Sequence, residues 1–181
     1  MLAEAERIDA IAYAAVARIE IPALDTAMSR LSRAANFSGL WIGSGALLVL
    51  FGGERGRRGV REGFVAIGVT SVIVNVAMKP VYRRPRPERD VLLPRHVPMP
   101  LSLSFPSGHA ASAFAFATGV ARVAPRVGLP LRLLAGAVAY SRVHTGVHFP
   151  GDVIAGSIAG VMAARLTSWA RERRFSPTSR P

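Results

Sequence analysis

The sequence contains no cysteine, which excludes a disulfide framework and any thiolate metal site. Aromatic residues make up only 7% of it, and Lys79 is the single lysine beside 22 arginines. The stacking surfaces and basic recognition helices of nucleic-acid-binding proteins are therefore missing, so the net charge of +12 does not predict a nucleic-acid partner. Residues 1–20 carry acidic side chains where a signal peptide has a basic region, and a cleaved signal peptide is not expected.

Apolar residues are abundant in spite of the charge. Half of the 181 residues are hydrophobic, and the mean hydropathy is +0.31 although 23 residues are Lys or Arg. Apolar segments separated by basic connections are typical of small membrane proteins. The sequence therefore predicts one domain, an all-α, integral-membrane helical bundle.

We expect about five membrane spans in residues 38–170. The apolar runs that predict them are residues 37–53, 63–81, 107–123, 131–143 and 150–169. Residues 1–37 carry too many charges to span a bilayer and predict amphipathic interfacial helices, broken near Pro22. The six prolines between Pro85 and Pro106 forbid a continuous helix there, and residues 171–181 are expected to form a disordered tail.

Five spans determine which connections share a membrane face. The N-terminal segment, residues 82–106 and residues 144–149 fall on one face, and the opposite face carries twelve basic residues. The first face has eight basic residues when the three assigned below to the candidate site are left out. Because cytoplasmic loops are richer in Lys and Arg, the positive-inside rule favours the opposite face as the cytoplasmic one. We therefore expect a bacterial plasma-membrane protein whose first face points outward. The sequence does not decide between a monomer and a homo-oligomer.

The first face collects three groups of chemically suggestive residues. In "KPVYRRPRP", Lys79 ends an apolar helix and is followed by several arginines that include Arg86; a snorkelling lysine in a basic loop is the structural alternative. In "FPSGHAAS", Ser107 is a suitable N-cap, Gly108 allows a ligand to approach the backbone, and His109 stands in the first helical turn. Such a helix start accepts phosphate, although an interfacial histidine is an equally simple interpretation.

The third group is "YSRVHTGVHFPGDVIAG". His148 and Asp152 are four residues apart, so a helix that begins near Pro150 brings the carboxylate toward the imidazole ring. Asp152 is the only acidic residue between Asp90 and Glu172, and a lone carboxylate at a membrane helix end needs a partner. His148 is the nearest candidate and Arg142 the alternative; the pair is either structural or a prepared nucleophile.

Together the three groups supply what phosphoryl transfer requires. Cations and backbone N–H groups bind phosphate oxygens, one histidine attacks phosphorus, and another protonates the leaving oxygen. One carboxylate among several cations is a poor site for Mg²⁺, so no metal and no other cofactor is expected.

The motifs K79-x6-R86-P87, P106-S107-G108-H109 and S141-R142-x5-H148-x3-D152 resemble the three-part signature of the type 2 phosphatidic acid phosphatase superfamily, which also includes the vanadium haloperoxidases. The resemblance covers residues 79–152 and implies a role for each matching residue. His148 is then the nucleophile that forms a phosphohistidine, Asp152 orients it, and His109 is the general acid. The residues implied to bind the phosphoryl oxygens are Lys79, Arg86, Ser107, Gly108 and Arg142. His144 lies outside the signature and is interpreted as a loop histidine.

The resemblance also implies a lipid substrate. A site at the ends of membrane helices favours a lipid phosphate or diphosphate, and the small, Ala- and Arg-rich chain is similar to compact actinobacterial members that act on polyprenyl carriers. We therefore expect decaprenylphosphoryl-5-phosphoribose or a polyprenyl diphosphate of cell-wall synthesis as the substrate. Phosphatidic acid and phosphatidylglycerophosphate are alternatives, as are a haloperoxidase and a non-catalytic lipid-binding protein. Family members commonly have six membrane spans, whereas we expect five here, with the helices of residues 1–37 in place of the sixth.

Overall fold

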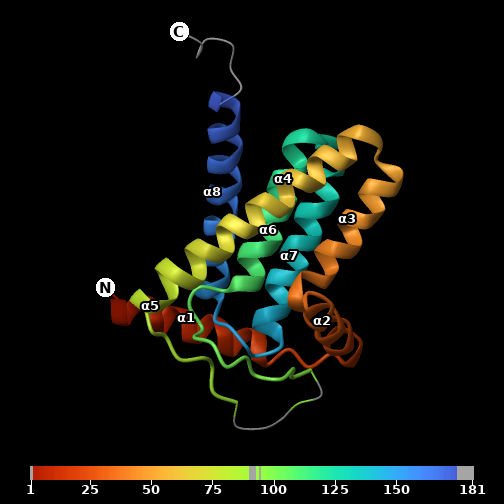
Figure 1. Cartoon of the computed structure of the whole chain (residues 1–181). Coiled ribbons are helices and arrows are strands. Elements are labelled where there is room, and N and C mark those ends of the chain that lie inside the picture. Colours follow the sequence, from red (N-terminus) through yellow and green to blue (C-terminus); the bar gives the residue numbers. More distant parts are fainter. Residues whose placement is uncertain (1, 90–92, 94, 175–181) are drawn as a thin grey trace.

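A computed structural model describes residues 2–89, 93 and 95–174, and over these residues the protein is helical with no strand (Figure 1). The elements are α1 (Leu2–Ala17), α2 (Pro22–Ala34), η1 (Asn36–Ser38), α3 (Gly39–Phe51), α4 (Gly53–Val72), η2 (Ile73–Met78), α5 (Lys79–Val81), α6 (Gly108–Val123), η3 (Pro125–Val127), α7 (Gly128–His144) and α8 (Pro150–Arg174). The all-α prediction is confirmed. The expected disordered tail is wrong for residues 171–174, which continue α8, and residues 175–181 lie outside the described part.

The helices differ in how well they suit a membrane. Two helical stretches, Gly53–Val81 and Pro150–Arg173, are long and apolar enough to cross a membrane. A third qualifies if α2 is counted together with η1 and α3 as one bent span. Because α6 and α7 have 16 and 17 residues, each is shorter than the roughly 20 residues a bilayer requires. Five spans therefore stay a prediction. The expected basic connection at residues 54–62 is wrong, because these residues form the first turns of α4.

Helix α6 lies at the centre of the bundle and packs against α4, α7 and α8. Its Phe116 is fully buried and contacts the rings of Trp41 and Phe64 at centroid distances of 5.5 and 5.3 Å. Helices α1 and α2 lie at one end together with residues 82–89 and 95–107, and the turns joining α3 to α4 and α6 to α7 lie at the other (Figure 1). The connections thus lie at the two ends of the bundle as expected, except that residues 54–62 are helical, and the assignment of these ends to membrane faces stays a prediction.

Small residues allow α8 to approach α6 closely. A Cβ atom at Gly156 would overlap the carbonyl oxygen of Ser107, and one at Gly160 would overlap that of Ala111. The spacing G-x-x-x-G places both glycines on the side of α8 that faces α6, which permits this close packing. Its consequence for the site is that α8 is held against the first turn of α6.

Two irregularities bend the chain beside the site. The axis turns by 69° between α2 and α3, where Phe37 and Ser38 adopt left-handed backbone angles with φ of 52° and 59°. After α4 the helix widens into the π-helical turn η2, which ends at Met78, and Lys79 is the first residue of α5. Pro80 accounts for this turn, because it has no N–H and its ring clashes with a regular α-helical carbonyl four residues earlier.

The N-terminal helices contact the rest of the molecule through polar groups. The guanidinium of the buried Arg95 donates to the carbonyl oxygens of Ala17 and Ile19. Pro22 is the first residue of α2, so the predicted break at this proline is confirmed. Residues 2–34 therefore pack as part of the bundle end rather than lying apart from it.

Candidate active site

The start of α6 has the predicted cap. Ser107 is the N-cap, and its Oγ accepts a hydrogen bond from Ala110 N at 3.4 Å. The Ser107 N–H donates to the main-chain oxygen of Asp152 at 2.9 Å, which ties α6 to α8. A Cβ at Gly108 would meet nothing within 4 Å, so a ligand has open access to this first turn. The helix start is therefore suited to an anion.

His148 and Asp152 are brought together as the sequence predicts. The Nδ1 atom of His148 lies 3.6 Å from Oδ2 of Asp152, and both side chains are buried. The loop that carries His148 is held by main-chain hydrogen bonds from Val147 N and His148 N to the carbonyl oxygen of Arg142, at 3.1 and 3.2 Å. Because Asp152 faces Nδ1, the Nε2 atom is left to face the anion-binding side chains.

Ser104 joins this pair and was not singled out from the sequence. Its Oγ donates to Asp152 Oδ2 at 2.5 Å and lies 3.4 Å from His148 Nδ1. The Phe149 N–H donates to the same carboxylate oxygen at 2.9 Å. Two hydrogen bonds, from Ser104 and from Phe149, therefore fix the Asp152 carboxylate oxygen that faces the imidazole.

Arg84 is a second residue that sequence reasoning missed. Its Nη1 contacts Asp152 Oδ1 at 3.0 Å and Asp9 Oδ2 at 2.5 Å, and its guanidinium stacks 4.1 Å above the centroid of the Phe149 ring. Asp9 also accepts from Gly151 N at 2.7 Å. The signal available in the sequence was its position within the basic run after Lys79, which several neighbouring arginines share.

Arg86 and Lys79 converge on Ser102. Lys79 Nζ and Arg86 Nη2 each lie 3.2 Å from Ser102 Oγ. Arg86 Nη1 donates to Val147 O at 2.5 Å and lies 3.2 Å from His148 Nε2. Arg86 is thus fixed beside the Nε2 atom of His148, and Lys79 is joined to Arg86 through Ser102.

Arg142 is buried behind this group, against α2. Its Nη1 donates to Ser32 Oγ at 2.5 Å, so it does not act as the alternative partner of Asp152. Its buried Nε has no hydrogen-bond partner among the described residues. Since a buried unpaired donor is costly, this atom is available to an anion.

His109 is bonded to a residue that the sequence did not indicate. Its Nε2 lies 2.9 Å from Asn36 Oδ1 of η1. His109 is within electrostatic range of the other cationic members of the site, which are Arg142, His148, Arg86 and Lys79. The structure thus brings the predicted site residues together at one end of the bundle.

Burial lowers the pKa of His148 to about 4, and the hydrogen-bonded Asp152 opposes this shift only in part. The positive charges of Arg86 and Arg142 lower this pKa further. Because the imidazolium is disfavoured, the ring is neutral at physiological pH, which is the form a nucleophile needs.

His144 corrects one sequence interpretation. It is the last residue of α7 rather than a loop residue, it is buried, and its Nε2 lies 2.6 Å from Asp25 Oδ1. Its function is therefore to hold α2 against α7. Among the described residues, no group of three or more His, Asp and Glu side chains is arranged to hold a metal ion.

The fold is that of an all-helical protein with apolar helices of membrane-spanning length, and several cationic residues and two histidines gather at one end of its bundle as a candidate anion site. The chain belongs to the PAP2 superfamily, whose family model matches residues 63–176.

Relatives by sequence carry the names of polyprenyl-lipid enzymes. The chain is 36% identical over 124 residues to decaprenylphosphoryl-5-phosphoribose phosphatase of Mycobacterium tuberculosis, covering 66% of this chain and 67% of the relative. It is 33% identical over 140 residues to the protein of that name from Mycolicibacterium smegmatis, covering 75% and 72%. It is 27% identical over 132 residues to undecaprenyl-diphosphatase BcrC of Bacillus subtilis, covering 73% of this chain and 65% of the relative's length.

Two solved structures share the fold. The structure of Aquifex aeolicus LpxE has a TM-score of 0.68 at 27% identity and covers 87% of this chain and 92% of its own. A PAP2-type phosphatidylglycerolphosphate phosphatase from Bacillus subtilis has a TM-score of 0.71 at 24% identity and covers 96% and 90%. The second comparison supports the fold alone.

Proposed function

We propose that this protein is a lipid phosphatase that removes the terminal phosphate of a polyprenyl-linked substrate through a phosphohistidine on His148. The observation that carries the proposal is the placement of this ring between a carboxylate and a guanidinium. Nδ1 lies 3.6 Å from Asp152, and Nε2 lies 3.2 Å from Arg86. An imidazole held in this way keeps its proton on Nδ1 and offers the Nε2 lone pair to phosphorus.

In the first step, the Nε2 lone pair of His148 forms the N–P bond while the bond from phosphorus to the leaving oxygen breaks. His109 donates its proton to that oxygen, so that the lipid-linked product leaves with this oxygen protonated. The phosphoryl oxygens are bound by Lys79, Arg86 and Arg142 and by the start of α6, where negative charge is stabilised.

In the second step, water attacks phosphorus and the N–P bond breaks, which returns the electron pair to Nε2. His109, now neutral, takes the proton of the attacking water and is ready for another cycle. Inorganic phosphate is the product. Apart from the attacking water, the scheme uses only His148 and His109 as nucleophile, acid and base.

The polyprenyl substrate class rests on two supports. The relatives at 33–36% identity are named for decaprenylphosphoryl-5-phosphoribose, and another relative is named for undecaprenyl diphosphate. The anion site lies at one end of a bundle with apolar helices, so the headgroup reaches the site while the prenyl chain stays in the bilayer. The proposed location is the bacterial plasma membrane with this end outward, where the less basic face lies.

The test is phosphate release by the full-length protein in detergent with EDTA present. The panel holds a polyprenyl-phosphoryl pentose 5-phosphate, a polyprenyl diphosphate, phosphatidic acid and phosphatidylglycerophosphate. We expect EDTA-resistant release that His148→Ala abolishes, and a rapidly quenched reaction with labelled phosphate should contain acid-labile, base-stable phosphohistidine.

His96→Ala is the matched control, because His96 is half-buried and, within the described part of the chain, its ring is hydrogen-bonded to Leu93 N alone, at 3.1 Å from Nδ1. It should retain activity. Release from no substrate, or equal release by His148→Ala, would overturn the proposal in favour of a non-catalytic lipid-binding protein.

A further inference from the structure

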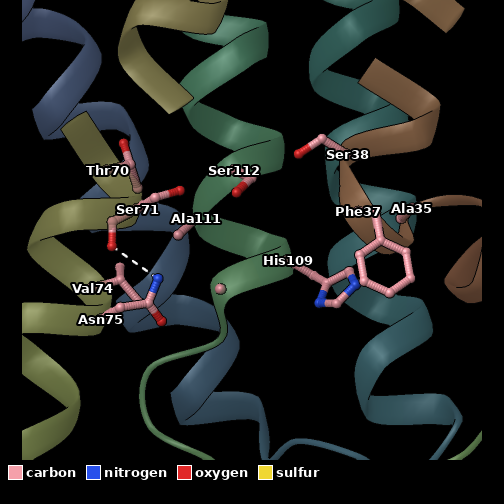
Figure 2. A pocket seen from close by; sticks show the side chains of 11 residues that line it. Ala35, Phe37, Ser38, Thr70, Ser71, Val74, Asn75, His109, Ala111 and Ser112 are labelled. Carbon is pink, nitrogen blue, oxygen red and sulfur yellow. Dashed lines mark hydrogen bonds between the residues drawn. The ribbon is translucent and has the colours of Figure 1, made fainter. Parts of the chain in front are cut away.

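The general-acid candidate His109 is hydrogen-bonded to a residue outside the sequence motifs. Its Nε2 atom lies 2.9 Å from Oδ1 of Asn36, the first residue of η1. In Figure 2 the His109 ring projects from α6 toward the turn that carries Ala35 and Phe37, the neighbours of Asn36 in the chain. Asn36 lies outside residues 63–176, which the family model matches, so membership of the family assigns it no role.

The chain between α2 and α3 is bent so that Asn36 reaches α6. The helix axis turns by 69° across this turn, and Phe37 and Ser38 have left-handed backbone angles although neither is a glycine. Such conformations are unfavourable for residues with a Cβ atom, and they are concentrated at functional sites. Asn36 directly precedes the two strained positions, and η1 packs against α6. The bend therefore places a side chain of the N-terminal segment beside the general acid.

The side chain of Asn36 is not needed for packing. Helix α2 is held at the site by Ser32, four residues earlier, whose Oγ accepts from the Arg142 guanidinium at 2.5 Å. Asn36 itself is exposed, and in the described part of the chain its side chain is hydrogen-bonded to His109 alone. The contribution of this amide is therefore expected in the behaviour of His109.

The hydrogen bond determines which nitrogen of His109 transfers the proton. An amide oxygen can only accept, so Asn36 Oδ1 keeps a hydrogen atom on Nε2. Nδ1 has no hydrogen-bond partner among the described residues and is left for the leaving oxygen. In the first step the imidazolium gives its Nδ1 proton to that oxygen, and in the second Nδ1 takes a proton from the attacking water. The bond from Nε2–H to Asn36 is retained in both steps.

A neutral amide suits this acid better than a carboxylate would. His148 gains positive charge when it attacks phosphorus, and the carboxylate of Asp152 beside it stabilises that charge. His109 must instead release its proton, which a neighbouring carboxylate would oppose. The two histidines thus have orienting partners of different charge, each matched to the role of its ring.

We propose that Asn36 is a positioning residue for the general acid, which fixes the orientation and the proton-bearing nitrogen of His109 without stabilising its charged form. This inference rests on the proposed phosphatase function and adds to it a residue of the N-terminal segment.

The first test is Asn36→Ala on two lipid substrates. An alcohol leaves as a strong base unless a general acid protonates it, whereas the lipid phosphate released from a diphosphate is a much weaker base and needs the acid little. We expect kcat/KM for a polyprenyl-phosphoryl pentose 5-phosphate to fall about tenfold, the effect of one lost hydrogen bond at the reacting groups, while kcat/KM for the polyprenyl diphosphate stays within about twofold. The melting temperature should be unchanged, because Asn36 is exposed.

The second test is Asn36→Asp, which keeps the accepting oxygen and adds a negative charge. A carboxylate beside the ring favours the imidazolium, so the alkaline limb of kcat/KM for the phosphomonoester should move to higher pH. The other charged or titratable groups that act on His109 are unchanged in this variant, and they are Arg142, His148, Arg86 and Lys79. A residue that only supported the fold would change the amount of active protein and leave this limb in place.

Asn75→Ala is the matched control, because Asn75 is the other asparagine of the chain, is also exposed, and donates from Nδ2 to Ser71 O at 2.9 Å. It should change neither kcat/KM nor the pH profile. Equal losses of Asn36→Ala on both substrates, no loss on the phosphomonoester, or an unmoved alkaline limb in Asn36→Asp would overturn the role of Asn36. Absence of phosphate release by the unmodified protein from every substrate would instead overturn the proposed function, so the two failures are distinguishable.

Discussion

Arg84 forms an ion pair with Asp152 at 3.0 Å, on the carboxylate oxygen that does not face His148. The same guanidinium nitrogen contacts Asp9 of α1 at 2.5 Å. Asp152 therefore has one oxygen for the imidazole and one for a cation, and that cation connects the loop after α5 to both α1 and α8. The charge of the carboxylate beside His148 is therefore balanced by Arg84, which occupies a position that the motif K79-x6-R86 leaves unspecified.

Replacement of Arg84 by Gln should be strongly destabilising. Arg84 is 10% exposed, and its loss leaves the carboxylates of Asp152 and Asp9 buried without their cation. Removal of one partner from a buried ion pair costs about 3–5 kcal/mol. Thermal unfolding in detergent should show the loss, and a second change, Asp9→Asn, should recover part of it. Arg83→Gln is the control, since Arg83 is exposed, and an equal effect there would contradict the role of Arg84.

Ser104→Ala should reduce kcat and leave KM nearly unchanged. Its hydroxyl donates to the buried Asp152 carboxylate and contacts no anion-binding side chain in the hydrogen bonds described here. A hydrogen bond to a charged group contributes about 1.5–3 kcal/mol, which corresponds to roughly 10- to 100-fold in rate. Steady-state kinetics measure this loss of kcat. Ser102→Ala is the comparison: it removes the oxygen that Lys79 and Arg86 share, so it should raise KM instead. A rise in KM alone for Ser104→Ala would refute the positioning role.

The pH profile of kcat/KM should extend unusually far into the acid range. The pKa of His148 is lowered to about 4, chiefly by burial, so the nucleophile stays neutral at every pH above that value. Protonation of His148 should therefore abolish activity only as the pH falls through about 4, rather than through about 6.5, the ordinary pKa of a histidine. Because the charge of Arg86 also lowers this pKa, the residual activity of Arg86→Gln should show its acid limb at higher pH on the same substrate. Coincident acid limbs would contradict this electrostatic coupling.

Much of the fold could be predicted because apolar runs and helix-breaking residues are local signals. Pro22 and Pro150 begin helices, and Ser107 caps one, as their chemistry indicates. The first turns of α4 were wrongly expected to be a loop, because a run of arginines is compatible with a loop or with a helix. Gly59 and Gly63 of this segment pack against α6, and this packing favours the helix. Such packing depends on residues distant in the sequence.

The site could be predicted only where short motifs carry it. His148 and Asp152 are four residues apart, so helical spacing alone brings them together. Ser104, Arg84 and Asn36 reach the site from an extended loop and a bent turn, where no periodicity predicts the direction of a side chain. His144 was misplaced because its bond to Asp25 joins segments 119 residues apart.

Gly156→Ala should affect both the stability and the site. A Cβ at this position overlaps the main-chain oxygen of Ser107, so α8 must move away from the first turn of α6. Overpacking of this kind typically costs about 1–3 kcal/mol, and the displaced helix start should bind phosphate less well and raise KM. Gly136→Ala in α7 is the control, since a Cβ there meets nothing within 4 Å and alanine favours the helix. Thermal unfolding and phosphate-release kinetics of the two variants make the comparison. If Gly156→Ala matched Gly136→Ala in both measurements, close contact between α8 and α6 would not be what positions the anion site.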